Sequence, residues 1–252
     1  MPRATYELEA YRAWQDPSAR SAAAVVPRVL EWIRPRSVID VGCGLGMWAK
    51  AFSDAGVPHV HGMDSPDVPT AELLIPEEDF VAVDLSRPVE TTRRYDLVVS
   101  LEVAEHLPAS AARTFVETLT ALGPVVLFSA AIPYQRGANH VNEQWPEYWA
   151  RLFADRGYRA IDCLRRLIWN DESVEPYYCQ NAILYIAEDR LVDFPALAAE
   201  ALPPGNVPLS LIHPHYYIKR SSFQDTSLKW WGFKARHYAS AILRRLRILP
   251  RV

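Results

Sequence analysis

Three glycines stand in one five-residue turn within the stretch VIDVGCGLGMWAKAF, Val38–Phe52, although the whole chain of 252 residues holds only ten. They are Gly42, Gly44 and Gly46. A glycine turn between a strand and a helix lets the backbone approach a ligand closely, because no Cβ intervenes and positive φ is accessible. The spacing is G-x-G-x-G, whereas dinucleotide sites use G-x-G-x-x-G, and the preceding Asp40 would repel a phosphate. The turn therefore predicts a ligand site of another kind.

Further carboxylates follow the next apolar runs of the sequence. Asp64 ends HVHGMD, Asp84 ends VAVD and is followed by Leu85, and Glu102 comes directly after YDLVVSL. Carboxylate oxygens accept hydrogen bonds from hydroxyl and amino groups. In isolation, Asp64 and Asp84 would be ordinary caps. Their order at consecutive strand ends favours binding, since the carboxyl ends of parallel strands share one edge of a sheet.

The elements that must position these groups are indicated by apolar runs. Continuous runs rich in Val, Ile and Leu are typical of strands buried on both faces of a parallel sheet, and five of them occupy 37–42, 59–64, 80–85, 95–102 and 125–131. Helical spacing closed by a glycine predicts helices over 47–56, 110–123 and 145–157. Two more strands are expected over 158–169 and 179–188. We expect an α/β fold, with a doubly wound, Rossmann-like, mostly parallel sheet and an antiparallel edge strand.

At these positions the sequence resembles the class I S-adenosylmethionine-dependent methyltransferases. The first motif of that family, an acid followed by G-x-G-x-G, is matched by DVGCGLG from Asp40. The resemblance implies S-adenosylmethionine as the cofactor, with Asp64 on the ribose hydroxyls. It also implies that Asp84, with Leu85 beside it, contacts the adenine end. The match follows the family order through residues 37–187, so it covers the central part of the chain.

The loop around Glu102 carries two interpretations. The family places contacts to the methionyl end of the cofactor here, which makes Glu102 a cofactor-binding candidate. The E-x-x-E-H spacing of Glu102, Glu105 and His106 is also similar to a stretch associated with a divalent ion in the ubiquinone-pathway O-methyltransferases. Two carboxylates and an imidazole suit magnesium or manganese. Because the spacing serves cofactor contacts as well, the metal site stays an alternative and no metal ligand is assigned.

Two histidines are candidates for the catalytic group. His106 follows Glu105 just beyond a strand end, and His140 lies in the polar loop GANHVNEQW after the fifth run. An alcohol needs a proton acceptor to become a good nucleophile, and a histidine pKa of about 6.5 suits that transfer at neutral pH. We predict His140 as the general base and His106 as the reserve candidate. The alternatives are a capping or supporting role for His106 and a simple hydrogen bond from His140 to the substrate.

Composition narrows the class of protein. The net charge is −3 and the central region has no basic stripe, which argues against a nucleic-acid substrate. The three cysteines, Cys43, Cys163 and Cys179, show no C-x-x-C spacing, so neither a disulfide framework nor a zinc site is indicated. The N-terminus has no long apolar core of the kind that a secretory signal needs. We therefore expect a cytoplasmic protein.

Three parts are expected along the chain: an N-terminal helical lead over 1–36, a Rossmann-like methyltransferase domain over 37–187, and a C-terminal extension over 188–252. The extension is predicted to end in a basic helix, because seven Lys and Arg residues and no acid follow Asp225. Such a helix packs on its own domain or contacts an anionic membrane surface or a partner. The sequence leaves the oligomeric state open.

The motifs and the resemblance together predict methyl transfer from S-adenosylmethionine to a small hydroxylated acceptor, with O-methylation of a sugar or natural-product intermediate as the expected reaction. Methyl transfer is an in-line displacement, so the protein mainly has to hold donor and acceptor aligned. The alternative from a different class is a catalytically inactive, cofactor-binding regulatory or scaffold protein. A nicotinamide-dependent oxidoreductase is opposed by the spacing of the glycines.

Overall fold

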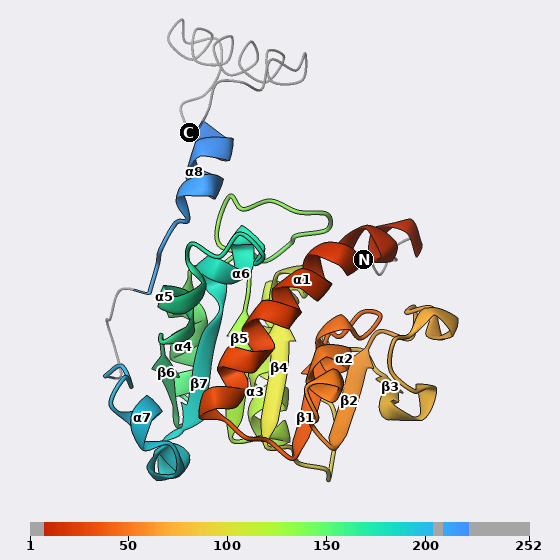
Figure 1. Ribbon diagram of the computed structural model, residues 1–252, viewed down its shortest axis with the longest axis horizontal. Helices are drawn as coiled ribbons and strands as arrows, with labels where there is room; N and C mark the ends of the chain where they lie inside the picture. Colours follow the sequence, from red (N-terminus) through yellow and green to blue (C-terminus); the bar gives the residue numbers. More distant parts are fainter. Residues whose placement is uncertain (1–7, 204–208, 222–252) are drawn as a thin grey trace, which may run out of the picture. The chain divides into compact units, whose positions relative to one another are not determined.

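A seven-stranded sheet forms the centre of the described part of the protein (Figure 1). The structure is a computed structural model, and it describes residues 8–203 and 209–221. The strands are β1 (Ser37–Val41), β2 (His59–Asp64), β3 (Phe80–Ala82), β4 (Leu97–Leu101), β5 (Val125–Ser129), β6 (Tyr158–Ile161) and β7 (Ile183–Ala187). Their order in the sheet is β3-β2-β1-β4-β5-β7-β6.

The first five strands run parallel to one another. The central strands β1, β4 and β5 are almost wholly buried, as their Val, Ile and Leu runs require. β7 pairs antiparallel with both β5 and β6, so the strand direction changes at this side of the sheet. The predicted doubly wound, mostly parallel sheet with an antiparallel edge is therefore confirmed.

The last two strands are shorter than the sequence predicts. β6 ends at Ile161, and residues 164–168 of the expected strand form a helix instead. Similarly, the start of the last expected strand belongs to a helix that ends at Asn181. Arg165 explains the first change, since it is buried and bonded through two nitrogens to both carboxylate oxygens of Asp162. This ion pair fits a turn followed by a helix, and apolar content alone did not indicate it.

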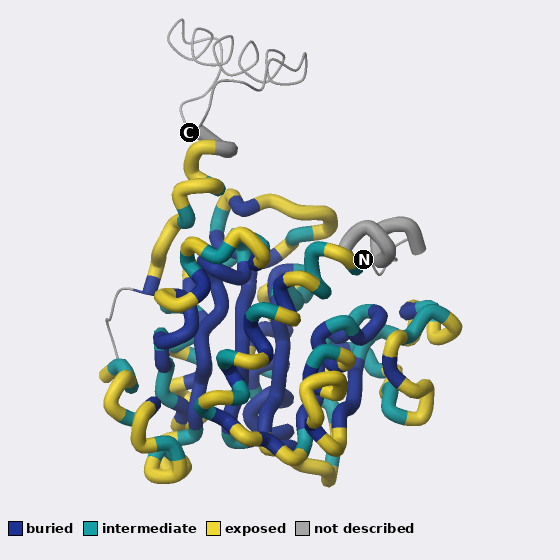
Figure 2. The backbone as a smooth tube through the Cα atoms, viewed as in Figure 1, coloured by how far each residue is buried: buried dark blue, intermediate teal, exposed yellow. Residues whose placement is uncertain are grey.

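Helices cover both faces of the sheet. The helices in the described residues are α1 (Leu8–Trp32), α2 (Met47–Asp54), α3 (Ala112–Leu122), α4 (Pro146–Ala154), α5 (Leu164–Ile168), α6 (Pro176–Asn181), α7 (Pro195–Ala198) and α8 (Pro214–Ser221). Short 3₁₀ segments in the same residues are η1 (Thr70–Glu72), η2 (Glu77–Asp79), η3 (Ala104–His106), η4 (Ala109–Ala111) and η5 (Glu188–Asp193). One apolar cluster packs α1, α2, α5 and α6 against one face, and a second packs α3 and α4 against the other. Figure 2 shows the buried strands between these layers.

Two compact units, 1–213 and 214–252, divide the chain. In the second unit, the described element is α8. The expected boundaries at residues 36 and 187 stay a prediction. The predicted basic helix after Asp225 lies outside the described residues. None of the helices in the described ranges combines the length and the apolar content that crossing a bilayer requires.

The carboxyl ends of β1, β2, β4 and β5 meet at one edge of the sheet, because these strands are parallel neighbours. The loops after them carry the glycine turn, Glu102 and His140, while Asp64 is the last residue of β2. The strand order reverses between β1 and β4, and open α/β sheets bind ligands at such a reversal. The fold thus gathers the candidate residues at the edge where a site is expected.

Candidate active site

The glycine turn links β1 to α2 and takes a left-handed backbone. Gly42, Gly44 and Gly46 have φ angles of 83°, 54° and 87°, a region in which a side chain is strained. The N–H of Gly44 donates to Asp64 Oδ2 at 2.7 Å. A Cβ at position 42 would lie 2.3 Å from a methyl carbon of Val103, so Gly42 makes room for the loop after β4. The turn therefore joins the ends of β1, β2 and β4.

Two carboxyl groups lie beside this turn, the buried Asp40 and the half-buried Asp64. Asp40 is only 3% exposed, and its Oδ2 has no hydrogen-bond partner among the described residues. Burial, followed by the charge of Asp64, raises the pKa of Asp40 to about 8. Burial also raises the pKa of Asp64, although N–H groups of Gly44 and Ser65 donate to its two oxygens. A buried carboxyl with an unpaired oxygen favours a ligand that brings positive charge or hydrogen-bond donors.

Asp84 and Leu85 lie on a turn that begins two residues after the end of β3. Asp84 Oδ1 accepts hydrogen bonds from the N–H and the hydroxyl of Ser86 at 3.1 and 2.6 Å. Arg87 Nε lies 3.4 Å from Asp84 Oδ2. Leu85 is buried in the apolar cluster under α3 and α4. The cofactor roles of both residues stay predictions.

Glu102 sits in the centre of a buried amide network after β4. Its Oε2 accepts a hydrogen bond from Gln135 at 2.6 Å, and its Oε1 accepts one from Asn181 at 3.1 Å. Gln180 connects to both amides. Glu102 itself has a left-handed φ of 56°, and its N–H donates to the carbonyl and hydroxyl oxygens of Ser129. Burial raises the pKa of Glu102 against the effect of these donors.

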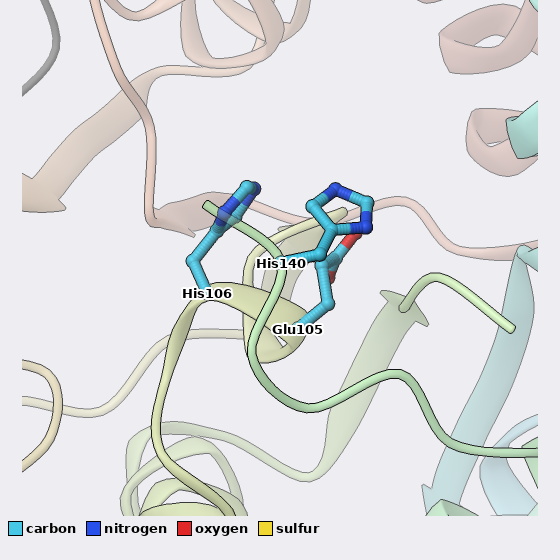
Figure 3. Close-up of side chains that lie close together, drawn as sticks. All are labelled: Glu105, His106 and His140. Atoms are coloured by element: carbon cyan, nitrogen blue, oxygen red, sulfur yellow. The ribbon is translucent and has the colours of Figure 1, made fainter. Parts of the chain in front are cut away.

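Glu105, His106 and His140 form a compact group in which one ligand atom of each lies within 4.8 Å of the others (Figure 3). The two imidazole centroids are 4.9 Å apart with the rings nearly perpendicular. Glu105 is fully buried, and neither carboxylate oxygen has a hydrogen-bond partner in the described ranges. Burial and the neighbouring Glu102 raise the pKa of Glu105 well above its usual value. Burial and the charge of His140 lower the pKa of His106 to about 4.

This group differs from the metal set that the sequence suggested as an alternative. His140 stands where the sequence suggested Glu102, whose two oxygens each accept a hydrogen bond from an amide, Gln135 and Asn181. One carboxylate and two imidazoles are donors that suit several divalent metals. Binding such an ion would require Glu105 to ionise, against the direction in which burial moves its pKa.

The loop that carries His140 is held by one acidic side chain. Glu143 accepts hydrogen bonds from the N–H groups of Tyr134 and Arg136 at 2.8 and 2.6 Å. His140 Nδ1 lies 2.8 Å from Glu143 Oε1. Tyr134, Arg136 and Asn139 all have left-handed φ angles, of 69°, 58° and 60°. Non-glycine residues in that conformation are strained and gather at functional sites.

The structure thus brings the predicted residues into two groups. Asp40, the glycine turn and Asp64 form one, and His106 and His140 form the other, next to Glu105. Sequence reasoning missed the roles of Gln135, Gln180 and Asn181 around Glu102. The adjacent polar residues Gln180 and Asn181, placed directly before an apolar run, were the available signal. Nothing in their spacing linked them to Glu102, which precedes Asn181 by 79 residues.

Comparison with known proteins gives a family match. A family model described as a methyltransferase domain matches residues 11–162. The chain is 29% identical over 129 residues to the ubiquinone biosynthesis O-methyltransferase of Bordetella avium, with 40% of this chain and 50% of that protein covered. It is 30% identical over 119 residues to the protein of the same name from Pseudomonas aeruginosa, with coverages of 42% and 51%. The chain therefore spans about half the length of these curated relatives.

Solved structures share the fold. S-adenosylmethionine-bound CalS10, an amino pentose methyltransferase from Micromonospora echinaspora involved in calicheamicin biosynthesis, gives a TM-score of 0.52 at 15% identity, covering 74% of this chain and 99% of that one. An O-methyltransferase family protein from Burkholderia thailandensis gives 0.50 at 16% identity, with coverages of 72% and 60%. At these identities the likeness shows the fold alone. Because the methyltransferase-domain model matches more than half of the sequence, this chain belongs to the class I S-adenosylmethionine-dependent methyltransferase family.

Proposed function

We propose that this chain transfers a methyl group from S-adenosylmethionine to a hydroxyl oxygen of a small acceptor, such as a sugar or another hydroxylated natural-product intermediate. The main support for the proposal is the pair of histidines His106 and His140. Their ring centroids are 4.9 Å apart, and they lie at the same edge of the sheet as the glycine turn. The names of the curated relatives, O-methyltransferases of ubiquinone biosynthesis, support oxygen as the acceptor atom.

The residues around the glycine turn fit the cofactor. When bound, S-adenosylmethionine supplies a methyl group on a positively charged sulfonium. Asp40 offers a buried oxygen without a partner among the described residues, and its carboxylate would be stabilised by a cationic ligand. Each oxygen of Asp64 accepts one backbone hydrogen bond and keeps a lone pair for a ribose hydroxyl. Asp84, Leu85 and Glu102 complete the proposed set at the adenine and methionyl ends.

His140 is the proposed general base. It accepts the proton of the acceptor hydroxyl through a ring nitrogen while the acceptor oxygen gains the methyl group. His106 is the weaker candidate, because its pKa of about 4 makes it a poor proton acceptor at neutral pH. Its ring packs nearly perpendicular to that of His140 and helps to orient it.

The remaining parts of the proposal concern partners and location. The near-neutral charge supports a small molecule over nucleic acid as the acceptor. The basic segment after Asp225 would pack on its own domain or, as the alternative, contact a membrane surface or a partner, and the protein would work in the cytoplasm. No metal is assigned to Glu105, His106 and His140.

Labelled-cofactor mass spectrometry tests the acceptor directly. The purified protein is incubated with cell extracts and with S-adenosylmethionine carrying a heavy methyl group, and His140→Ala serves as the control. We expect one small compound to gain the labelled methyl group on oxygen. Label on nitrogen, on carbon or on a macromolecule would contradict the proposed acceptor class.

Calorimetry separates the alternatives. We expect micromolar binding of S-adenosylmethionine and of its demethylated product, with no comparable binding of NAD. Stronger binding of NAD would favour an oxidoreductase and overturn the cofactor assignment. Tight binding of S-adenosylmethionine without turnover on a broad acceptor panel would favour a regulatory or scaffold protein instead.

A further inference from the structure

Glu143 connects both ends of the loop that carries His140. Its Oε2 accepts a hydrogen bond from the Tyr134 N–H, and its Oε1 accepts from the Arg136 N–H and from the imidazole of His140 at 2.8 Å. The side chains of His140 and Glu143 are only 12% and 19% exposed, so water competes weakly for these bonds. The position of the ring therefore depends on this one carboxylate.

The contact also selects the tautomer of His140. A carboxylate oxygen accepts hydrogen bonds and cannot donate them, so the ring nitrogen that faces Glu143, Nδ1, carries the proton. The lone pair of the neutral ring is then on Nε2. His106 packs against the same ring at nearly a right angle and limits its rotation.

Gly137 provides the space for the far side of this ring. A Cβ at position 137 would lie 2.1 Å from Nε2 and 2.5 Å from Cε1 of His140. Any side chain there would displace the imidazole, although it would leave the charge of Glu143 and its bonds to the Tyr134 and Arg136 N–H groups in place. The position of the His140 ring thus depends on two residues. Gly137 has no side chain that would clash with the ring, and Glu143 holds the ring by a hydrogen bond.

We propose that Glu143 is a positioning residue that holds His140 with its Nε2 lone pair ready for the proton of the acceptor, and that Gly137 leaves the room for this orientation. The inference rests on the proposed function, in which His140 is the general base. The oxygen–hydrogen bond of the acceptor breaks and its proton moves to Nε2. The acceptor oxygen forms a bond to the methyl carbon as the carbon–sulfur bond breaks, and the electron pair of that bond stays on sulfur, so the neutral thioether leaves. The carboxylate of Glu143 then stabilises the imidazolium that forms.

Nuclear magnetic resonance of the full chain with ¹⁵N-labelled histidine tests the tautomer without any acceptor. His140→Gln identifies the signals of His140 among those of the seven histidines. We expect the proton on Nδ1 in the wild-type protein and a shift of the proton toward Nε2 in Glu143→Ala. Glu188→Ala is the matched control, because Glu188 is 63% exposed and pairs with Arg159. A wild-type ring protonated on Nε2, or an unchanged tautomer in Glu143→Ala, would overturn the proposal.

Kinetics with the acceptor found by labelling test the consequence. Glu143→Ala and Gly137→Ala should each lower kcat about 10- to 100-fold, with KM and the cofactor Kd changed less than about threefold. Glu143→Gln keeps one acceptor oxygen and should retain more turnover than Glu143→Ala. An unchanged kcat in Glu143→Ala would contradict the positioning role. If the wild-type protein binds no S-adenosylmethionine, the proposed function fails, and the tautomer still decides whether Glu143 positions His140.

Discussion

The glycine turn and the loop 134–143 lie at the same edge of the sheet but are built differently. Both use left-handed backbone: Gly42, Gly44 and Gly46 in the turn, and Tyr134, Arg136 and Asn139 in the loop. Glycine adopts this conformation without steric strain, whereas for other residues it costs roughly 1 kcal/mol or more of conformational free energy per residue. The loop therefore needs a further source of stability, and Glu143 at its end supplies it with hydrogen bonds to the N–H groups of Tyr134 and Arg136.

The difference separates a locally determined half of the site from one that depends on distant contacts. The turn follows from a contiguous motif between a strand and a helix. The loop depends on Glu143 and Gly137 within it and, through Gln135, on hydrogen bonds to Glu102 and Asn181, which lie 33 and 46 residues away in the sequence. A change in the turn should therefore affect the cofactor, while a change in the loop should affect turnover with the cofactor still bound.

The largest expected effect is at Gly44. Gly44→Val should remove measurable binding of S-adenosylmethionine, because a β-branched residue at φ 54° is strained and the N–H to Asp64 would shift. Calorimetry measures it. Gly56→Val is the matched control, since Gly56 has φ 93° with no atom within 4 Å of a Cβ built there. Normal binding by a folded Gly44→Val protein would mean that the turn has only a structural role.

The next effect tests the loop. His140→Ala should lower turnover by about 10²-fold or more, the usual contribution of a positioned base, and should leave cofactor affinity intact. It should also remove the acidic limb of the pH–rate profile. His106→Ala should have the smaller effect, because its pKa is about 4. If the limb survives in His140→Ala and disappears in His106→Ala, the roles of the two histidines are reversed.

Substitution of Asp64 tests whether its carboxylate binds the cofactor as well as the N–H of Gly44. Asp64→Ala should weaken cofactor binding by about 1–3 kcal/mol, since it removes charge-assisted hydrogen bonds and the acceptor of the Gly44 N–H. Asp64→Asn should lose less, because it keeps an acceptor oxygen. Asp67→Ala, at an exposed neighbour, is the control. A loss below about 0.5 kcal/mol in Asp64→Ala would place the ribose contact elsewhere.

The last prediction concerns how cofactor affinity at the glycine turn depends on pH through the titration of Asp40. With a pKa of about 8, Asp40 holds a proton at neutral pH that a cationic ligand would displace. Cofactor affinity should therefore rise by up to about tenfold per pH unit as the pH approaches 8, and then level off. Calorimetry in buffers of different ionisation heat should detect the released proton. Asp40→Asn should abolish both the rise of affinity with pH and the release of the proton. An unchanged pH dependence in that variant would exclude Asp40 as the cause.

The same group predicts how stability changes without ligand. The folded pKa of about 8 lies above the ordinary value of 3.8, so the folded state holds the proton more tightly than the unfolded state. The contribution of Asp40 to stability is therefore complete below about pH 4 and is lost as the pH rises toward 8. Saturating S-adenosylmethionine should offset part of that loss, which thermal melts at several pH values would show.

The sequence alone determined the sheet, the glycine turn and the carboxylates at the strand ends. These features depend on hydrophobic periodicity and on local backbone geometry, both of which short segments carry by themselves. The limits of this reasoning lie at β6 and at the start of α6, where apolar content predicted longer strands than the structure has. There, the ion pair of the buried Arg165 with Asp162 and the burial of the Gln180 and Asn181 amides favour helical turns.

Only the tertiary structure decided what surrounds Glu102 and His140. The partners of Glu102 come from 33 and 79 residues farther along the chain, and His140 meets His106 only because β4 and β5 are neighbours in the sheet. A side-chain hydrogen bond between loops depends on how the strands bring those loops together. Sequence spacing therefore identified the groups that can do chemistry, and the packing of the sheet decided which of them meet.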